Sequence, residues 1–318
     1  MFDNRLYVID NSIGCNSIMH IVKLTDGKRE IMVIKILCIG DVVGRPGRRA
    51  LAEILPRFIE ENAIDLVVCN AENAAGGSGL TPQMFRKILH YGVDVVTLGD
   101  HVFRRNEIIE ILDKSDRIIR PANLSPRASG KGWCVVATKS GRYQVAVITL
   151  LGQMYMKPVD SPWSTLEKVL NEIPPAVKVR IVDFHAEASS EKVAMGWFCN
   201  GRVSVVFGTH THIPTADARV LDGGTAYISD VGMTGPYDSV LGRRVDRVLY
   251  SLTTSMPTPF QIADENIRMC GAVAQVDADT GKALSIERVD VPLTRKIGDD
   301  TQEVKEANTD QPRRQNSF

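Results

Sequence analysis

The fold can be worked out from the stretch Val205-Val206-Phe207-Gly208-Thr209-His210-Thr211-His212-Ile213-Pro214. Its apolar run stops at a glycine, and two histidines follow in the pattern H-x-H. In an extended segment alternate side chains point the same way, so His210 and His212 are expected to face one point in space. Two converging imidazoles indicate a metal site, whereas an isolated H-x-H is more often one buried and one surface histidine. Ligand-type residues at equivalent positions elsewhere decide between these two interpretations.

Four other apolar runs also lead directly into polar residues. They precede Gly40-Asp41, Asn70-Ala71-Glu72-Asn73, Gly99-Asp100-His101 and Asp183-Phe184-His185-Ala186-Glu187. The length and β-branched content of these runs predict buried strands. In α/β folds the carboxyl ends of the strands are where ligands bind. Four of the six histidines lie at such ends, namely His101, His185, His210 and His212. This distribution favours the metal site.

The bulk composition excludes several classes of protein. Lysine plus arginine and aspartate plus glutamate both total 38, so a net charge of zero gives no support to an extended nucleic-acid surface, although a small nucleotide remains a suitable substrate. The six cysteines form no C-x-x-C pair, which is typical of reduced thiols in a cytosolic protein. No apolar stretch approaches the roughly 18 residues that span a bilayer. The start of the chain lacks the features of a secretory signal, so we expect a cytoplasmic protein.

The chain is expected to divide into three parts. The strand and helix pattern occupies residues 35–296, and residues 297–318 are polar and are predicted to form a disordered tail. Residues 1–34 have two interpretations. They are either an extra strand pair with a turn at Asp26-Gly27, or a peripheral extension upstream of a natural start at Met32.

Residues 35–296 predict one α/β domain. Helical spacing is found near 48–62, 83–91, 106–112, 164–173 and 188–198, between the predicted strands. Thr81-Pro82 is a helix start signal, and turns at 139–141 and 279–281 indicate hairpins. The pattern predicts a four-layer α-β-β-α sandwich, in which two mixed sheets pack face to face with helices outside.

The polar strand ends suggest a particular chemistry. Carboxylate, amide and imidazole ligands together suit Mn, Fe or Zn better than Ca or a structural zinc. So many ligands allow two metals about 3.5–4 Å apart, which clamp the oxygens of an in-line phosphoryl transfer and lower the pKa of a bridging water. A histidine beside such a site can instead protonate the leaving group, a role worth about 10²–10⁴-fold in rate.

The five ordered motifs resemble those of the calcineurin-like metallophosphoesterases, and N-A-E-N in place of the usual G-D-x-x-D block is similar to the bacterial 2′,3′-cyclic-nucleotide 2′-phosphodiesterase subfamily. The resemblance implies a bimetal centre, often with iron. It implies a first metal held by Asp41, Asn73 and His212, a bridging Glu72, and a second metal held by Asp100, His185 and His210. His101 is implied to be the acid near the leaving oxygen. The resemblance also implies a homo-oligomer.

One position departs from the family pattern. The family motif usually reads G-N-H, whereas this chain has Gly99-Asp100-His101. The extra negative charge predicts retained metal binding with altered metal preference or reduced turnover. Asp183 and Glu187 are expected to support the histidine loop rather than bind metal. Asp230 and Thr234 match no ligand motif.

The sequence therefore predicts a bimetal phosphodiesterase that hydrolyses 2′,3′-cyclic nucleotides by attack of a metal-bridging hydroxide. A broader phosphomonoesterase or nuclease is an alternative, because the substrate-binding residues are not identified. A regulatory protein in which Asp100 has impaired catalysis is another. Measured turnover and competition between substrates distinguish these three functions.

Overall fold

Two sheets contain the strands in the part of the chain that the computed structural model describes, which is residues 8–9, 21–23 and 30–294. The first sheet has ten strands: β1 (Val8–Ile9), β2 (Ile21–Lys23), β3 (Glu30–Ile39), β4 (Asp41–Val42), β5 (Leu66–Asn70), β6 (Val95–Thr97), β7 (Ile118–Ile119), β14 (Met233–Pro236), β15 (Ile267–Asp277) and β16 (Ala283–Pro292). The second has six: β8 (Trp133–Ala137), β9 (Gln144–Leu151), β10 (Val179–His185), β11 (Val205–Thr209), β12 (Arg219–Val220) and β13 (Ala226–Ile228).

Parallel strands form the centre of each sheet. In the first sheet the order is β4-β14-β15-β3-β5-β6-β7, and β3, β5, β6 and β7 pair in parallel. In the second the order is β12-β13-β11-β10-β9-β8, and β9, β10, β11 and β13 pair in parallel. The predicted hairpins are present as the antiparallel pairs β8–β9 and β15–β16. Each sheet is therefore mixed, and its parallel strands end at a common edge.

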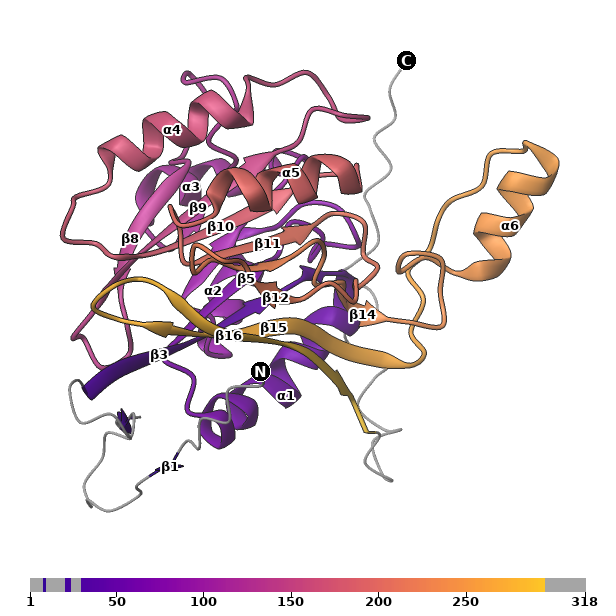
Figure 1. The fold of residues 1–318 in the computed structure, drawn as a ribbon. Coiled ribbons are helices and arrows are strands. Elements are labelled where there is room, and N and C mark those ends of the chain that lie inside the picture. Colours follow the sequence, from indigo (N-terminus) through magenta and orange to yellow (C-terminus); the bar gives the residue numbers. More distant parts are fainter. Residues whose placement is uncertain (1–7, 10–20, 24–29, 295–318) are drawn as a thin grey trace.

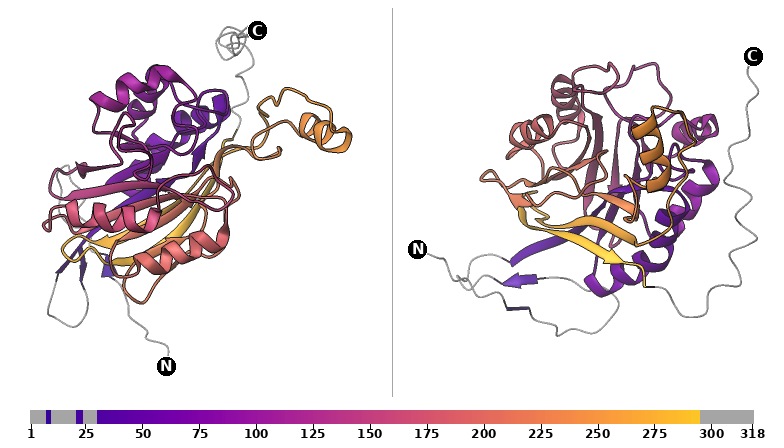
Figure 2. Two further views of the ribbon diagram at one scale, coloured as in Figure 1. Left: turned by 90° about the horizontal axis from the view of Figure 1, so that it is seen from above. Right: turned by 90° about the vertical axis from the view of Figure 1, so that its right-hand side faces the viewer.

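The helices lie outside the two sheets (Figures 1 and 2). Those that pack on the first sheet are α1 (Gly44–Asn62), α2 (Pro82–His90), the short 3₁₀ helix η1 (Asn106–Ile108) and α3 (Ile109–Lys114). Those on the second sheet are α4 (Pro162–Glu172) and α5 (Ser189–Cys199). The start of α2 is capped as predicted, because the Thr81 hydroxyl accepts the N–H of Met84.

Successive side chains of each central strand point into different apolar cores. In β3, Leu37 packs against the helices of the first sheet, whereas Ile36 points toward the second sheet. In β10, Ile181 points toward the first sheet, whereas Val182 packs against α4 and α5. This is the period-2 pattern of strands buried on both faces. Three cores between four layers confirm the predicted sandwich.

One helix was not predicted. The segment between β14 and β15 contains α6 (Val245–Thr254), which stands away from the two sheets in Figure 1 and in the left view of Figure 2. Val248 is its one buried residue, whereas Leu249, Tyr250 and Leu252 are exposed. None of the described helices is both long and apolar enough to cross a membrane.

The start of the chain joins the first sheet. β2 pairs antiparallel with β3, with Ile21 opposite Met32 and Lys23 opposite Glu30, which corresponds to the strand-pair interpretation of residues 1–34. β3 therefore begins before the expected Lys35. The Asp26-Gly27 turn and the predicted tail 297–318 lie outside the described residues. A natural start at Met32 stays a prediction.

The cysteines within the described residues are all buried free thiols, namely Cys38, Cys69, Cys134, Cys199 and Cys270. Burial raises the pKa of each of these thiols, to about 12 for Cys134 and Cys199 and to about 11 for Cys270. They are uncharged side chains at neutral pH, as the absence of a C-x-x-C pair led us to expect.

Candidate metal centre

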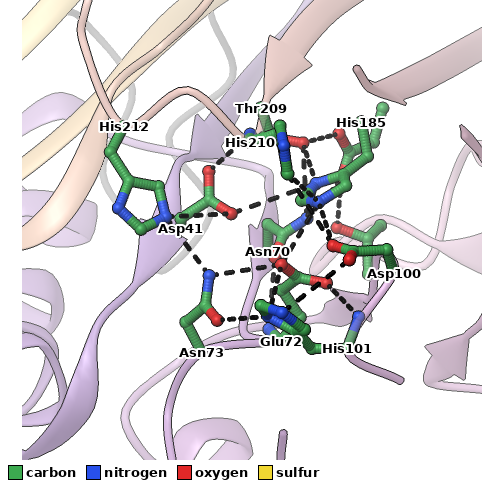
Figure 3. Close-up of polar contacts among 12 residues, drawn as sticks. Asp41, Asn70, Glu72, Asn73, Asp100, His101, His185, Thr209, His210 and His212 are labelled. Atoms are coloured by element: carbon green, nitrogen blue, oxygen red, sulfur yellow. Dashed lines mark hydrogen bonds and ion pairs between the residues drawn. The ribbon is translucent and has the colours of Figure 1, made fainter. Parts of the chain in front are cut away.

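Acidic and amide side chains of the first sheet converge at the carboxyl ends of its strands (Figure 3). Asp41 is the first residue of β4, separated by one residue from the end of β3, whereas Glu72 and Asn73 follow β5 and Asp100 follows β6. Asp41 is 0% exposed and Glu72 is 1% exposed. Gly99 permits this crowding, because a Cβ there would lie 2.3 Å from His185 Nε2 and 2.4 Å from Glu72 Oε2. Buried carboxylates at this density require positive charge nearby.

The second sheet places imidazoles against this acidic group. His185 is the last residue of β10, and its Nε2 lies 3.2 Å from Glu72 Oε1 and 3.4 Å from Asp100 Oδ1. His210 follows β11, and its Nδ1 lies 3.0 Å from His185 Nε2 and 3.8 Å from Asp100 Oδ1. Ligand atoms of these four residues all lie within 4.8 Å of one another. They form one group with the donor types of a metal site.

A second group adjoins the first. His212 Nε2 lies 3.9 Å from Asp41 Oδ1 and 3.2 Å from Asn73 Nδ2. Asp41 Oδ1 also lies 3.9 Å from His185 Nδ1, which belongs to the first group. The amide nitrogen of Asn73, rather than its oxygen, faces His212. The structure thus brings together the seven predicted ligand residues in two neighbouring groups.

The predicted backbone of the H-x-H segment is wrong. β11 ends at Thr209, and His210 and His212 have φ angles of 94° and 66°, so the segment is a loop and not an extended strand. Both rings still face the acidic residues (Figure 3). They do so because the backbone turns in the left-handed region, where non-glycine residues are rare. Alternation along a strand is therefore not the reason that the two rings converge.

Each of the three histidines has its outer ring nitrogen paired with an oxygen. Thr209 Oγ1 donates its proton to Asp183 at 2.7 Å, so it accepts from His185 Nδ1 at 2.9 Å. The carbonyl of Leu241 accepts from His212 Nδ1 at 3.1 Å. In the same way Glu187 Oε2 lies 3.1 Å from His210 Nε2. When the rings are neutral, these contacts place the ring proton on the outer nitrogen and leave the inner nitrogen as a lone pair, which is how histidine binds a metal.

Two buried oxygens also fit a metal. Asp41 Oδ1 and Asp100 Oδ1 have no hydrogen-bond partner, although such orphans are rare in folded proteins. Both point to positions near the inner nitrogens of the histidines. Carboxylate oxygens and neutral imidazole nitrogens are the ligands of Mn, Fe and Zn. The residues present therefore fit the predicted metal centre.

The pKa values in the first group are shifted by burial and by mutual charge. Burial disfavours the charged form of Asp100, but the neighbouring His185 outweighs it and lowers the pKa of Asp100. Burial favours the neutral ring of His185, yet Glu72, Asp100 and Asp41 outweigh it and raise its pKa. Burial and the neighbouring His185 lower the pKa of His210 to about 4. The carboxylates thus stabilise a positive charge at this point, which a proton or a metal can supply.

His101 lies beside the two groups on a more open side, with 27% of its side chain exposed. Its Nδ1 lies 3.0 Å from Asn73 Oδ1, and its Nε2 lies 3.7 Å from Asp100 Oδ2. Its backbone N–H donates to Glu72 Oε2 at 3.1 Å. His101 is thus the more exposed neighbour of the buried carboxylates and imidazoles.

Asp183 points away from the inner nitrogens and joins the two sheets. It accepts hydrogen bonds from Asn70 and Thr97 of the first sheet and from Thr209 of the second. This agrees with its predicted supporting role. Burial raises the pKa of Asp183 to about 6. Asn70 is part of the N-A-E-N motif that the sequence analysis identified, but no role was predicted for it.

Two further groups that contact the histidine loop were not predicted from the sequence, namely a buried ion pair and a backbone carbonyl. Asp230 was left unassigned and Lys192 was not considered, yet they form a buried pair behind the histidine loop. The Leu241 carbonyl comes from the segment that carries α6, for which no element was predicted. A backbone carbonyl leaves no residue-type signal, and the pair is separated by 38 residues, so neither could be recognised from local spacing.

Comparison with known proteins places this geometry in a family. Residues 37–289 match the model of the YmdB-like proteins. The chain is 40% identical over 256 residues to the 2′,3′-cyclic-nucleotide 2′-phosphodiesterase of Bacillus subtilis, covering 80% of this chain and 96% of that protein. The crystal structure of a phosphatase from Mycoplasma pneumoniae superposes with a TM-score of 0.77 at 30% identity, covering 82% of this chain and 94% of that one.

A more distant structure agrees in fold. The 5′-nucleotidase of Candida albicans superposes with a TM-score of 0.50 at 12% identity, covering 82% of this chain and 52% of that chain. At this identity the likeness concerns the arrangement of the sheets and helices alone. The family match and the nearer relatives carry the assignment, so the chain belongs to the YmdB-like family of calcineurin-like metallophosphoesterases.

Proposed function

We propose that this protein is a metal-dependent phosphodiesterase that hydrolyses 2′,3′-cyclic nucleotides. The observation that carries the proposal is the convergence of three carboxylates and three imidazoles. Two buried oxygens of these carboxylates have no hydrogen-bond partner. The substrate class comes from the Bacillus subtilis relative, which is named for this activity. Net charge zero is compatible with such a small anionic substrate.

The proposed ligands form two sets that share Glu72. Asp41, Asn73 and His212 belong to one set, and Asp100, His185 and His210 belong to the other. Two bound metals, of the Mn, Fe or Zn type, would supply charge for the phosphoryl oxygens and acidify a water molecule. The role of Asn73 requires its amide oxygen to take the position of its NH₂ group, a change that keeps the shape of the side chain.

His101 is the proposed acid. The reaction forms a bond between phosphorus and a water oxygen and breaks the bond between phosphorus and the 2′ oxygen, leaving a 3′-phosphate. The 2′ oxygen departs as an alkoxide unless it receives a proton, which the partly exposed ring of His101 can provide. The contact between His101 Nδ1 and the amide group of Asn73 orients that ring. Proton transfer of this kind contributes about 10²–10⁴-fold to a rate.

The test is hydrolysis of 2′,3′-cyclic AMP by the purified full chain with Mn²⁺, with and without a chelator. His101→Ala should lose about 10²–10⁴-fold in turnover and keep its bound Mn²⁺, because its ring protonates the leaving group. His210→Ala should lose both turnover and metal. His90→Ala is the matched control, because His90 lies at the exposed end of α2, and it should behave like the wild type.

The products and outcomes separate the functions. Chromatography should show 3′-AMP from the wild type, in agreement with cleavage at the 2′ oxygen. Turnover that persists in chelator would contradict the metal-dependent mechanism. A protein that holds metal but hydrolyses neither 2′,3′-cyclic AMP nor p-nitrophenyl phosphate would instead be a regulatory protein, and preference for the monoester would identify a phosphomonoesterase.

A further inference from the structure

The histidine loop, residues 209–212, has a backbone conformation that is intrinsically unfavourable for non-glycine residues. His210 and His212 both have positive φ angles, of 94° and 66°. A non-glycine residue in this region is strained and persists only where its surroundings impose this backbone. Other groups must therefore hold this loop in place.

Lys192 reaches the loop from behind. It lies on α5, and although lysine is seldom buried its side chain is only 2% exposed. Its Nζ donates to the carbonyl of Thr209 at 2.7 Å and to Asp230 Oδ2 at 2.5 Å. The Thr209 carbonyl belongs to the peptide that links Thr209 to His210. Lys192 thus fixes the peptide that enters the first histidine.

Asp230 holds the other side of His210. Its side chain is 1% exposed, and its Oδ2 accepts the backbone N–H of Thr211 at 3.2 Å and the Thr211 hydroxyl at 2.7 Å. Its Oδ1 accepts the N–H of Gly232 at 2.8 Å. Lys192 and Asp230 therefore hydrogen-bond to the peptide groups on both sides of His210. Thr211, which Asp230 contacts, directly precedes His212 in the chain.

Stability alone does not explain a buried pair of this kind. Removing two charges from water costs several kcal/mol per ion, and apolar residues of similar volume are often as stable. The hydrogen bonds described for the two side chains end instead on the backbone and hydroxyl groups around the histidines, at Thr209, Thr211 and Gly232. Their direction indicates that the pair determines the shape of this loop.

We propose that Lys192 and Asp230 form a positioning pair that holds His210 and His212 in the geometry that binds metal, and that this pair thereby determines metal affinity without touching the metal. The inference rests on the metal centre of the proposed function and does not depend on the substrate. The pair acts through the loop backbone, as supporting residues act on other metal ligands.

The test is a calorimetric titration of the metal-free full chain with Mn²⁺. Asp230→Asn removes the negative charge of the pair and leaves the ammonium group of Lys192, whereas the double variant Lys192→Met with Asp230→Leu replaces both charged side chains and leaves no charge unpaired. Each should bind Mn²⁺ about 10–100-fold more weakly, as loss of supporting contacts does at other metal sites. Turnover should recover as the Mn²⁺ concentration is raised, which a general defect in folding would not do.

Asp217→Asn is the matched control. Asp217 accepts hydrogen bonds from Thr215 and Ser229 in the adjacent turn, and none described from residues 209–212. This variant should lower thermal stability and leave Mn²⁺ affinity unchanged. If Asp230→Asn fails to fold, the double variant decides. Folded variants with wild-type Mn²⁺ affinity would overturn the proposal, whereas weakened binding in a protein inactive on cyclic nucleotides would support the pair and refute the substrate.

Discussion

The two sheets contribute different halves of the candidate metal centre. The acidic half comes from the first sheet, where Asp41 lies within two residues of the end of β3 and Asp100 lies three residues after the end of β6. Both positions can be recognised in the sequence as the end of an apolar run. The imidazole half comes from the second sheet, where His210 and His212 lie in a loop of unusual backbone. The position of each acidic ligand follows from its place at the end of a strand. The position of each histidine in the loop depends on hydrogen bonds with residues that are distant in the sequence. The comparison shows that ligand identity and ligand geometry have separate origins in this chain.

The largest expected effect comes from removing the central charge of the acidic half. Glu72→Gln keeps the shape of a residue that contacts His185 and the His101 backbone and removes its negative charge. We expect turnover to fall by about 10³-fold, equivalent to about 4 kcal/mol of transition-state stabilisation. Metal analysis after gel filtration should show loss of bound Mn²⁺.

Glu53→Gln on α1 is the control for this variant. Glu53 is exposed and pairs with Arg49 four residues away, an interaction of little energetic weight. It should leave metal content and turnover unchanged. If Glu72→Gln retained its full complement of Mn²⁺, the acidic half would not be the charge that holds the metals.

A smaller effect is expected at the junction of the two halves. Asp183→Asn replaces one acceptor oxygen by an NH₂ group, which donates hydrogen bonds and does not accept them. The variant side chain therefore cannot accept hydrogen bonds from all of Asn70, Thr97 and Thr209. Urea unfolding in chelator should show a loss of about 1–3 kcal/mol, the penalty for an unsatisfied buried group. Mn²⁺ affinity should fall by about 10-fold, because the Thr209 contact orients His185. Unchanged affinity with reduced stability would show that Asp183 supports the fold alone.

The smallest expected effect sharpens the comparison at Asp100. Asp100→Asn introduces the residue that the resemblance to the family led us to expect at this position. It keeps an oxygen ligand and removes one negative charge from the acidic half. We expect metal binding to persist and turnover with Mn²⁺ to rise about fivefold, equivalent to about 1 kcal/mol. Activity assays with Mn²⁺, Zn²⁺ and Fe²⁺ measure both rate and metal preference. No change in either property would contradict the expectation that the carboxylate alters this site.

The acidic ligands could be predicted from the sequence, whereas the geometry of the histidine loop could not. Asp41, Glu72 and Asp100 were identifiable because each lies at the end of an apolar run, and parallel strands bring such ends together. The geometry of His210 was not, because its backbone is held by two residues that are 38 positions apart from each other. The helix α6 was missed because Val248 is its one buried residue, so no apolar stripe faces a core.

The buried cysteines have a consequence for following the unfolding of this protein. Cys69 lies in the core under the helices of the first sheet, Cys38 and Cys134 lie between the sheets, and Cys199 lies under the helices of the second sheet. A thiol reagent reaches none of them until the core around it opens. The rate at which each cysteine is alkylated, read by peptide mass spectrometry, therefore measures how often its own layer opens. The natural chain carries a reporter of local opening in each of its three cores.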